Sequence, residues 1–174
     1  MNTESSDVLK INAFIESLKH HNPNVSSAAV KKLVQSVPTT VQPLIDAFYN
    51  STDQSLQAYI VQALAQIANP EAVDLLAEVV GTEVANHCQG NVRRIAARGL
   101  GLIGSTSNNP EILQRALEKL TWALTTPQDW GLRYAAAVSL QEIATPAANT
   151  ALQQALKQES DKVVQARIAA VING

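Results

Sequence analysis

The chain has 174 residues, of which 46% are hydrophobic and 16% charged, and its formal net charge at pH 7 is −2. These values predict a soluble globular protein with one domain, residues 1–174, and exclude a disordered chain. So small a net charge gives no general attraction to nucleic acid. The apolar runs are too short for a membrane span and the N-terminus lacks a signal peptide, which together with the single cysteine predicts a cytoplasmic location.

Five consecutive pairs of helices are predicted along the chain. The second helix of each pair carries apolar residues four places apart, as in Leu56, Ile60 and Leu64, and this spacing fills one helical face. Asparagine and proline mark the breaks between helices, and no segment alternates as a strand does. In chain order the predicted segments are 8–18 and 25–34, 41–49 and 56–68, 72–85 and 92–104, 112–124 and 132–144, and 150–156 and 164–172.

Such pairs are expected to stack, because one thin amphipathic pair cannot bury its own apolar face. The segment VRRIAARGLGLIG, Val92 to Gly104, resembles the second helix of a HEAT repeat. The short repeat length is similar to that of the HEAT-like repeats of phycobilisome bilin lyases, and the resemblance covers nearly the whole chain. It implies an all-α fold, a right-handed α-solenoid of about five HEAT-like helical pairs.

The longest departures from the repeat spacing are two turns, NHCQGN at Asn86–Asn91 in the third pair and TTPQDWG at Thr125–Gly131 in the fourth. Insertions at equivalent places in successive repeats lie side by side. The two turns are therefore predicted to form two walls of one cleft, and loops on a rigid scaffold commonly carry function.

The turn NHCQGN places His87 beside Cys88, the only cysteine. Asn91 is predicted to cap a helix that begins at Val92, after a tight backbone at Gly90. Cys88 would then precede a helix start whose dipole favours the thiolate, with His87 as a proton partner. The alternatives are a buried apolar cysteine and a solvated histidine. No metal site is expected, because the other two histidines are distant in the sequence and there is no second cysteine.

The second feature of this region is its positive charge. The interval between Glu83 and Glu111 contains no acidic residue but holds Arg93, Arg94 and Arg98. Guanidinium groups match carboxylates in pairs, so the cluster would suit a ligand with two carboxylates. The alternative is that these arginines pair with acids of neighbouring repeats, such as Glu78 or Asp129.

The turn TTPQDWG is followed by aromatic residues. Trp130 and Tyr134 are four residues apart and are expected to share a helical face, on which a flat conjugated ligand could stack. Their alternative role is a hydrophobic staple that closes the helix pair. Asp129 is interpreted either as a helix N-cap or as an acceptor for ligand N–H groups.

The motif NHCQGN resembles that of the smaller subunits of phycoviolobilin lyase-isomerases, a branch of the bilin lyase family that acts on the phycoerythrocyanin alpha chain. The resemblance implies an enzyme subunit that works with a larger HEAT-like lyase subunit. The pair would attach phycocyanobilin to a cysteine of a phycobiliprotein alpha chain and isomerise it to phycoviolobilin, with the bilin as substrate and no permanently bound cofactor.

This resemblance implies that His87 and Cys88 are catalytic, with Cys88 either an acid–base group or a transient nucleophile. The alternative functions are a noncatalytic HEAT-repeat scaffold or bilin chaperone that binds phycobiliprotein, and an interaction adaptor without pigment. The residues predicted to bind substrate are Asn86, Gln89, Asn91, Arg93, Arg94, Asp129, Trp130, Arg133 and Tyr134.

Overall fold

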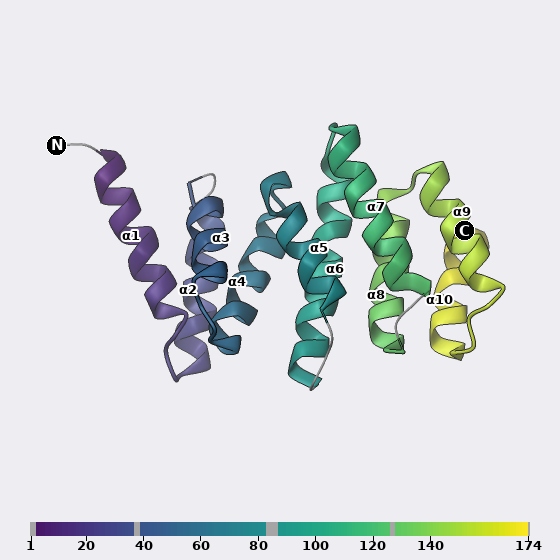
Figure 1. The fold of residues 1–174 in the computed structure, drawn as a ribbon, viewed down its shortest axis with the longest axis horizontal. Coiled ribbons are helices and arrows are strands. Elements are labelled where there is room, and N and C mark those ends of the chain that lie inside the picture. The colour runs from purple at the N-terminus through teal and green to yellow at the C-terminus, as the bar shows by residue number, and fades with distance from the viewer. Residues whose placement is uncertain (1–2, 37–38, 83–86, 126–127, 174) are drawn as a thin grey trace. The chain divides into compact units, whose positions relative to one another are not determined.

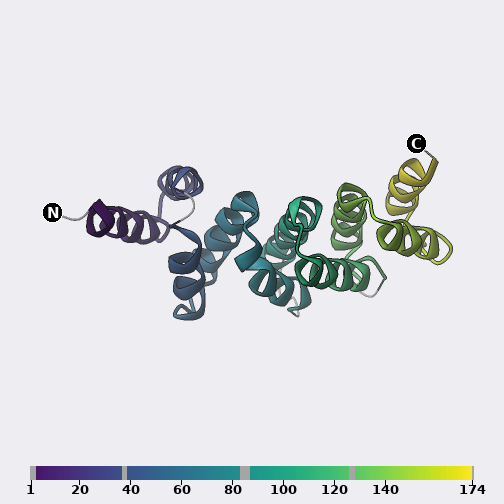
Figure 2. The ribbon, with the colours of Figure 1, turned by 90° about the horizontal axis from the view of Figure 1, so that it is seen from above.

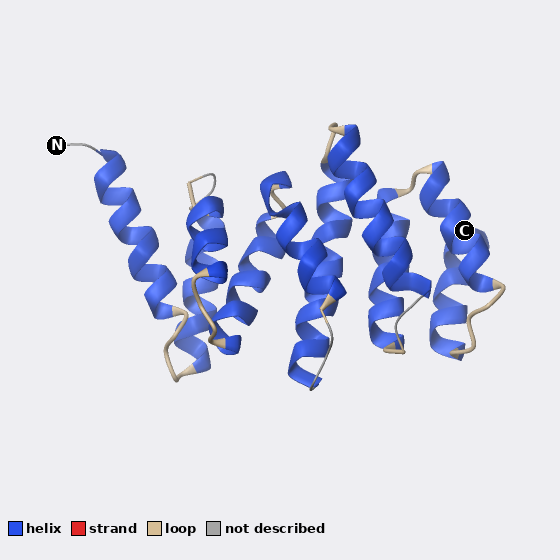
Figure 3. Ribbon diagram, viewed as in Figure 1, coloured by secondary structure: helices blue, strands red, loops and turns tan. Residues whose placement is uncertain are grey.

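A computed structural model describes the chain except residues 1–2, 37–38, 83–86, 126–127 and 174. The described residues form ten α-helices and one short 3-10 helix, with no strand among them, which confirms the predicted all-α fold (Figure 3). None of the described helices is long and apolar enough to cross a membrane. The contacts divide the chain into two compact units, Met1–Ala72 and Val73–Gly174, while a single domain stays a prediction.

The first unit consists of two helical pairs and a 3-10 turn. Helix α2 packs against α4, and α1 packs against α3, so the pairs lie in two layers. Two core side chains, Leu33 and Leu44, are completely buried. The elements are α1 (Thr3–Ser17), α2 (Pro23–Gln35), α3 (Val41–Tyr49), α4 (Gln54–Ile67) and η1 (Pro70–Ala72).

The second unit contains three helical pairs and both turns singled out in the sequence. Helices α6, α8 and α10 form one layer, and α5, α7 and α9 form the other (Figures 1 and 2). The elements are α5 (Val73–Gly81), α6 (His87–Thr106), α7 (Pro110–Thr125), α8 (Trp130–Ile143), α9 (Pro146–Leu156) and α10 (Lys162–Asn173).

Polar side chains begin the helices at the predicted breaks. The Asn22 side chain accepts a hydrogen bond from the backbone N–H of Asn24, and the Thr145 side chain accepts one from Ala148. Both helices then start on a proline, whose missing N–H costs nothing in the first turn. These caps explain why residues 22–24 and 145–146 separate helices.

The start of α6 differs from the prediction. The helix begins at His87 and not at Val92, so Asn91 is not its N-cap and Gly90 does not form a tight turn. Gly90 is buried inside the helix and has no positive φ. A glycine costs a helix only about 1 kcal/mol relative to alanine, and continuing the helix gives the backbone groups of this segment hydrogen-bond partners.

Helices α6 and α8 make the most extensive contact among the described helix pairs. Gly101 of α6 faces Ser139 of α8, and a Cβ added to Gly101 would lie 2.9 Å from the Ser139 Cα. The buried Ser139 hydroxyl donates to the carbonyl oxygen of Ala97 at 2.9 Å. The two backbones are therefore held together across a glycine.

Replacing Gly101 with alanine should lower the free energy of unfolding by about 1–3 kcal/mol or more, because the new methyl group meets backbone as well as side-chain atoms. Urea denaturation followed by circular dichroism would measure the change. Gly81→Ala is the matched control, since among the described residues its Cβ would meet only the flexible Nζ end of Lys119, at 3.1 Å. Equal losses in both variants would contradict this account of α6 and α8.

Candidate functional site

A groove of about 620 Å³ lies along α6, α8 and α10 on the second unit. Its position follows from three helical stripes in which residues recur every fourth place. Two of its apolar side chains are half exposed, Trp130 at 50% and Val163 at 54%. The stripes are Arg94 and Arg98 on α6; Trp130, Tyr134 and Val138 on α8; and Val163 and Arg167 on α10.

The groove unites three of the predicted binding residues, Arg94, Trp130 and Tyr134. Apolar and aromatic side chains form its floor, and guanidinium groups lie among them. This composition suits a flat, largely apolar ligand that also carries negative charge. The start of α8 lies beside α6, and Trp130 and Gly131 of the second turn line the groove. Residues 86 and 126–127 lie outside the described residues, so the prediction that the two turns form two walls of one cleft stays a prediction.

Arg94 pairs with Asp129 across the two helices. The Arg94 Nη2 donates to Asp129 Oδ1 at 2.8 Å, and Nε donates to Oδ2 at 3.3 Å. Asp129 also caps α8 by accepting from the Gly131 N–H at 2.9 Å. A Cβ on Gly131 would lie 2.5 Å from the Arg94 Cζ, so the glycine leaves room for the guanidinium. Both structural alternatives raised for these residues are therefore confirmed.

The ionisation of Asp129 is set by opposing effects. Burial raises the pKa of its carboxyl, but the hydrogen bond and charge of Arg94 and the backbone N–H groups of Gly131 and Leu132 lower it. The net pKa lies below the ordinary value for aspartate. The carboxylate thus stays ionised at neutral pH and keeps Arg94 in place.

Arg98 also has an acidic partner on α8. Its Nη2 donates to Glu142 Oε1 at 2.6 Å, and its Nη1 donates to the Ser139 hydroxyl at 3.3 Å. The predicted partners included Asp129 but not Glu142. The four-residue spacing from Arg94 to Arg98 was the signal that both belong to one face of α6.

Arg93 does not reach the groove. Its side chain is buried, and Nε donates to the backbone carbonyl oxygen of Val80 on α5 at 2.8 Å. Burial lowers its pKa, and the charge of Asp129 partly opposes this shift. Neighbouring positions on a helix lie about 100° apart, so Arg93 and Arg94 cannot share one face. Arg93 therefore does not line the groove with Arg94 and Arg98, and its contact with a substrate stays a prediction.

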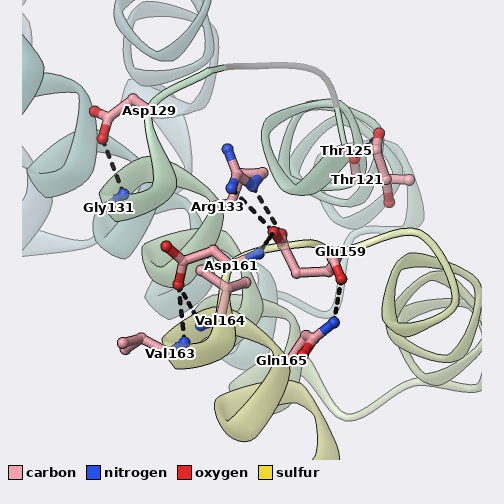
Figure 4. Close-up of polar contacts among 10 residues, drawn as sticks. All are labelled: Thr121, Thr125, Asp129, Gly131, Arg133, Glu159, Asp161, Val163, Val164 and Gln165. Atoms are coloured by element: carbon pink, nitrogen blue, oxygen red, sulfur yellow. Dashed lines mark hydrogen bonds and ion pairs between the residues drawn. The ribbon is translucent and has the colours of Figure 1, made fainter.

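Arg133 forms a separate, more deeply buried ion pair with Glu159 (Figure 4). Its Nε donates to Oε2 at 2.7 Å and its Nη2 donates to Oε1 at 2.9 Å, and the exposed fractions of the two side chains are 14% and 4%. The hydrogen bonds from Arg133 lower the pKa of Glu159 against the opposing effect of burial. Arg133 borders a different cavity, of about 530 Å³, which it shares with Trp130.

The segment after Glu159 is ordered by the same carboxylate. Glu159 accepts from the Asp161 N–H at 2.8 Å, and its backbone carbonyl accepts from the Gln165 side chain. Asp161 in turn accepts from the N–H groups of Val163 and Val164, and so caps α10 (Figure 4). The Arg133 ion pair therefore places α10 against α8, and with it one wall of the groove.

The motif NHCQGN is only partly described. Asn86 and the side chains of His87 and Cys88 lie outside the described residues, and the helical backbone begins at His87. His87 and Asn91 precede Arg94 by seven and three residues, so their backbone positions lie on the side of α6 that leads to Arg94. Asn91 is exposed, whereas Gln89 is half-buried, four residues before Arg93.

The described residues include no group of three histidine, cysteine, aspartate or glutamate side chains placed to hold a metal ion. His20 and His21 stack on each other in the first unit, with ring centroids 4.3 Å apart.

Comparison with known proteins identifies the family to which this fold belongs. A family model described as HEAT repeats matches residues 81–173, and one described as PBS lyase HEAT-like repeat matches residues 56–82. The bilin biosynthesis protein PecF of Nostoc sp. (strain PCC 7120) is 61% identical over 99% of this chain and 100% of its own length. The chain belongs to the family of HEAT-repeat bilin lyases.

Other members of the bilin lyase family are more distant. The phycocyanobilin lyase subunit beta of the same Nostoc strain is 31% identical, over 94% of this chain and 84% of the relative. A chain of the solved complex of CpcE and CpcF of phycocyanin lyase from Nostoc sp. PCC7120 matches with a TM-score of 0.78 and 30% identity. That match covers 94% of this chain and 98% of the other.

Replacing Glu159 with glutamine should destabilise the protein by about 3–5 kcal/mol at pH 7, because Arg133 would keep a buried charge without its partner. Glu159 has a lowered pKa in the folded state, so its contribution is complete above the unfolded pKa of about 4.3. It is lost as pH falls through the folded pKa. The difference between native protein and variant should therefore shrink below about pH 4.

Denaturant titrations at several pH values would measure this difference. Asp74→Asn is the control, because it breaks the exposed ion pair with Arg115 and should cost at most about 1 kcal/mol. A Glu159→Gln loss as small as that of the control would show that the buried pair does not hold the segment before α10.

Proposed function

We propose that this chain is the smaller subunit of a bilin lyase-isomerase. Together with a larger HEAT-like subunit it attaches phycocyanobilin to a cysteine of a phycobiliprotein alpha chain and isomerises the pigment to phycoviolobilin. The main support for the proposal is the groove, which brings Trp130 and Tyr134 of α8 together with the guanidinium groups of α6, the helix that begins with His87. The 61% identity to a bilin biosynthesis protein supports it.

The groove complements an open-chain tetrapyrrole group by group. A volume of about 620 Å³ lies within the usual range for small-molecule sites. The aromatic rings of Trp130 and Tyr134 offer a face for the conjugated plane, and a guanidinium group in the groove suits a propionate. Asp129 Oδ2 has acceptor capacity beyond its bond from Arg94 and could accept a pyrrole N–H.

The proposed chemistry belongs to the start of α6. Conversion of phycocyanobilin to phycoviolobilin removes a proton at C2 of ring A and delivers one at the C5 methine bridge, so an acid and a base are required but no oxidant. His87 is proposed to move these protons, since imidazole titrates near neutral pH. Cys88 is proposed either as the second acid–base group or as a transient nucleophile.

The corrected helix start changes the setting of Cys88. As the second residue of α6 it lies in the first turn, where unpaired backbone N–H groups favour a thiolate. Asn86, Gln89 and Asn91 remain proposed substrate contacts. A cytoplasmic location is part of the proposal, because a reducing compartment would keep the thiol free.

Replacing His87 with glutamine, or Cys88 with serine, should abolish isomerisation while attachment persists in part, because the thiol that becomes linked to the pigment belongs to the acceptor. The variant, the partner subunit, the acceptor and phycocyanobilin would be incubated together, and the absorption spectrum of the adduct recorded. Phycoviolobilin absorbs at shorter wavelength, since ring A leaves the main conjugated system. His21→Gln, in the first unit, is the matched control and should behave as the native protein does.

A noncatalytic scaffold or bilin chaperone makes a different prediction for the same experiment. The ion pairs of Arg94 and Arg98 are compatible with a groove that only holds the pigment. In that case both His87→Gln and Cys88→Ser would still give the short-wavelength adduct at the native rate. An adaptor without pigment would show no spectral change when bilin is added to the complex.

A further inference from the structure

Arg167 on α10 differs from the other arginines of the chain in its charge environment. Four of the six form ion pairs, and the fifth, the buried Arg93, donates to a backbone carbonyl. Arg167 forms no ion pair with any residue that the structure describes, and its Nη2 donates to the neutral amide oxygen of Gln141. The four ion pairs are Arg94 with Asp129, Arg98 with Glu142, Arg115 with Asp74 and Arg133 with Glu159.

The donors of Arg167 are also incompletely used. Its Nε is buried and has no hydrogen-bond partner among the described residues. A buried donor without an acceptor is unfavourable, more so when the donor group is charged. The same side chain lines the groove, one helical turn after the half-exposed Val163. The groove therefore contains a guanidinium with both unmatched charge and unmatched hydrogen-bonding capacity.

We propose that Arg167 binds a propionate carboxylate of the bilin in this groove. The inference rests on the proposed function, and it names the group that recognises the acidic side chain of the substrate. A carboxylate matches the guanidinium fork in shape and charge. Arg94 and Arg98 are less suited, because a propionate beside them would also approach the carboxylates of Asp129 and Glu142.

This assignment gives the bilin an orientation. Propionates belong to the two central rings of the tetrapyrrole, so Arg167 would hold the middle of the molecule at the α10 wall. The conjugated plane then extends over Tyr134 and Val138 of α8. A terminal ring is left free to reach α6, the helix that begins with His87.

The test compares two ligands and four forms of the protein, each in complex with the larger subunit. Phycocyanobilin and its dimethyl ester, in which both propionates are neutral, would be titrated and the dissociation constants obtained from absorption changes. Arg167→Gln should weaken binding of phycocyanobilin by about 10- to 100-fold, as expected for a charge-assisted pair. Binding of the diester should change by less than about threefold, within the scatter expected when no contact is lost.

Two further variants sharpen the comparison. Arg115→Gln makes the same change in net charge outside the groove and should leave both affinities at native values. Arg167→Lys keeps the charge but loses the planar fork, so its affinity for phycocyanobilin should lie between those of native protein and Arg167→Gln. Circular dichroism would show whether each variant folds. If Arg167→Gln does not fold, Arg167→Lys takes its place in the test.

The outcomes separate the inference from the function on which it rests. If the native complex binds neither ligand, the proposed function fails. If the native complex binds both ligands, and replacement of Arg167 weakens both equally or neither, then the assignment of Arg167 is overturned while the proposed function stands. A loss confined to the free acid supports both.

Discussion

The close approach of α6 and α8 is the constraint on which the rest of the second unit depends. Gly101 lies so close to Ser139 that there is no space for a Cβ on the glycine, and the Ser139 hydroxyl donates to the Ala97 carbonyl. Together these two contacts set the distance and the register of the two helices. With this register the Arg94 guanidinium lies over Gly131 and reaches Asp129. The floor of the groove is therefore a consequence of backbone packing as well as of its own side chains.

Carboxylates at or just before the starts of helices connect each repeat to the one before it through ion pairs. Asp129 both caps α8 and pairs with Arg94 of α6, while Glu159 pairs with Arg133 of α8 and orders the segment that begins α10. Each acid thus links the local geometry of a helix start to a neighbouring helix. Four of the six arginines form ion pairs with acidic residues. This explains why a positive cluster in the sequence does not translate directly into an anion site.

The helical architecture could be predicted because its signal is local. The four-residue apolar spacing and the breaks predicted the ten α-helices that the described residues form, and α3 has the predicted bounds, Val41–Tyr49. The predicted start of α6 was wrong because asparagine and glycine do not define a helix boundary uniquely. Both are typical of helix caps, but both are also tolerated inside helices. The candidate groove was predicted only in part. The Arg93 side chain points away from the groove because it donates to a carbonyl of α5, and Arg167 lines the groove because α10 packs beside α8. Residue spacing along a single helix predicts neither of these contacts.

The proposed roles separate pigment binding in the groove from chemistry at the start of α6, and the pH dependence of the two processes can test this separation. Asp129 and Glu159 both have pKa values below their ordinary values. Burial raises the pKa of Asp129, but the hydrogen bond and charge of Arg94 and two backbone N–H groups together outweigh it, whereas for Glu159 the hydrogen bonds from Arg133 are the largest effect. The ion pairs Arg94–Asp129 and Arg133–Glu159 therefore stay charged between about pH 5 and pH 8, above the ordinary carboxyl pKa values of about 4. A histidine ordinarily titrates inside that interval. A pH dependence found in isomerisation but not in bilin affinity would accordingly trace to the start of α6, where His87 lies, and not to the groove.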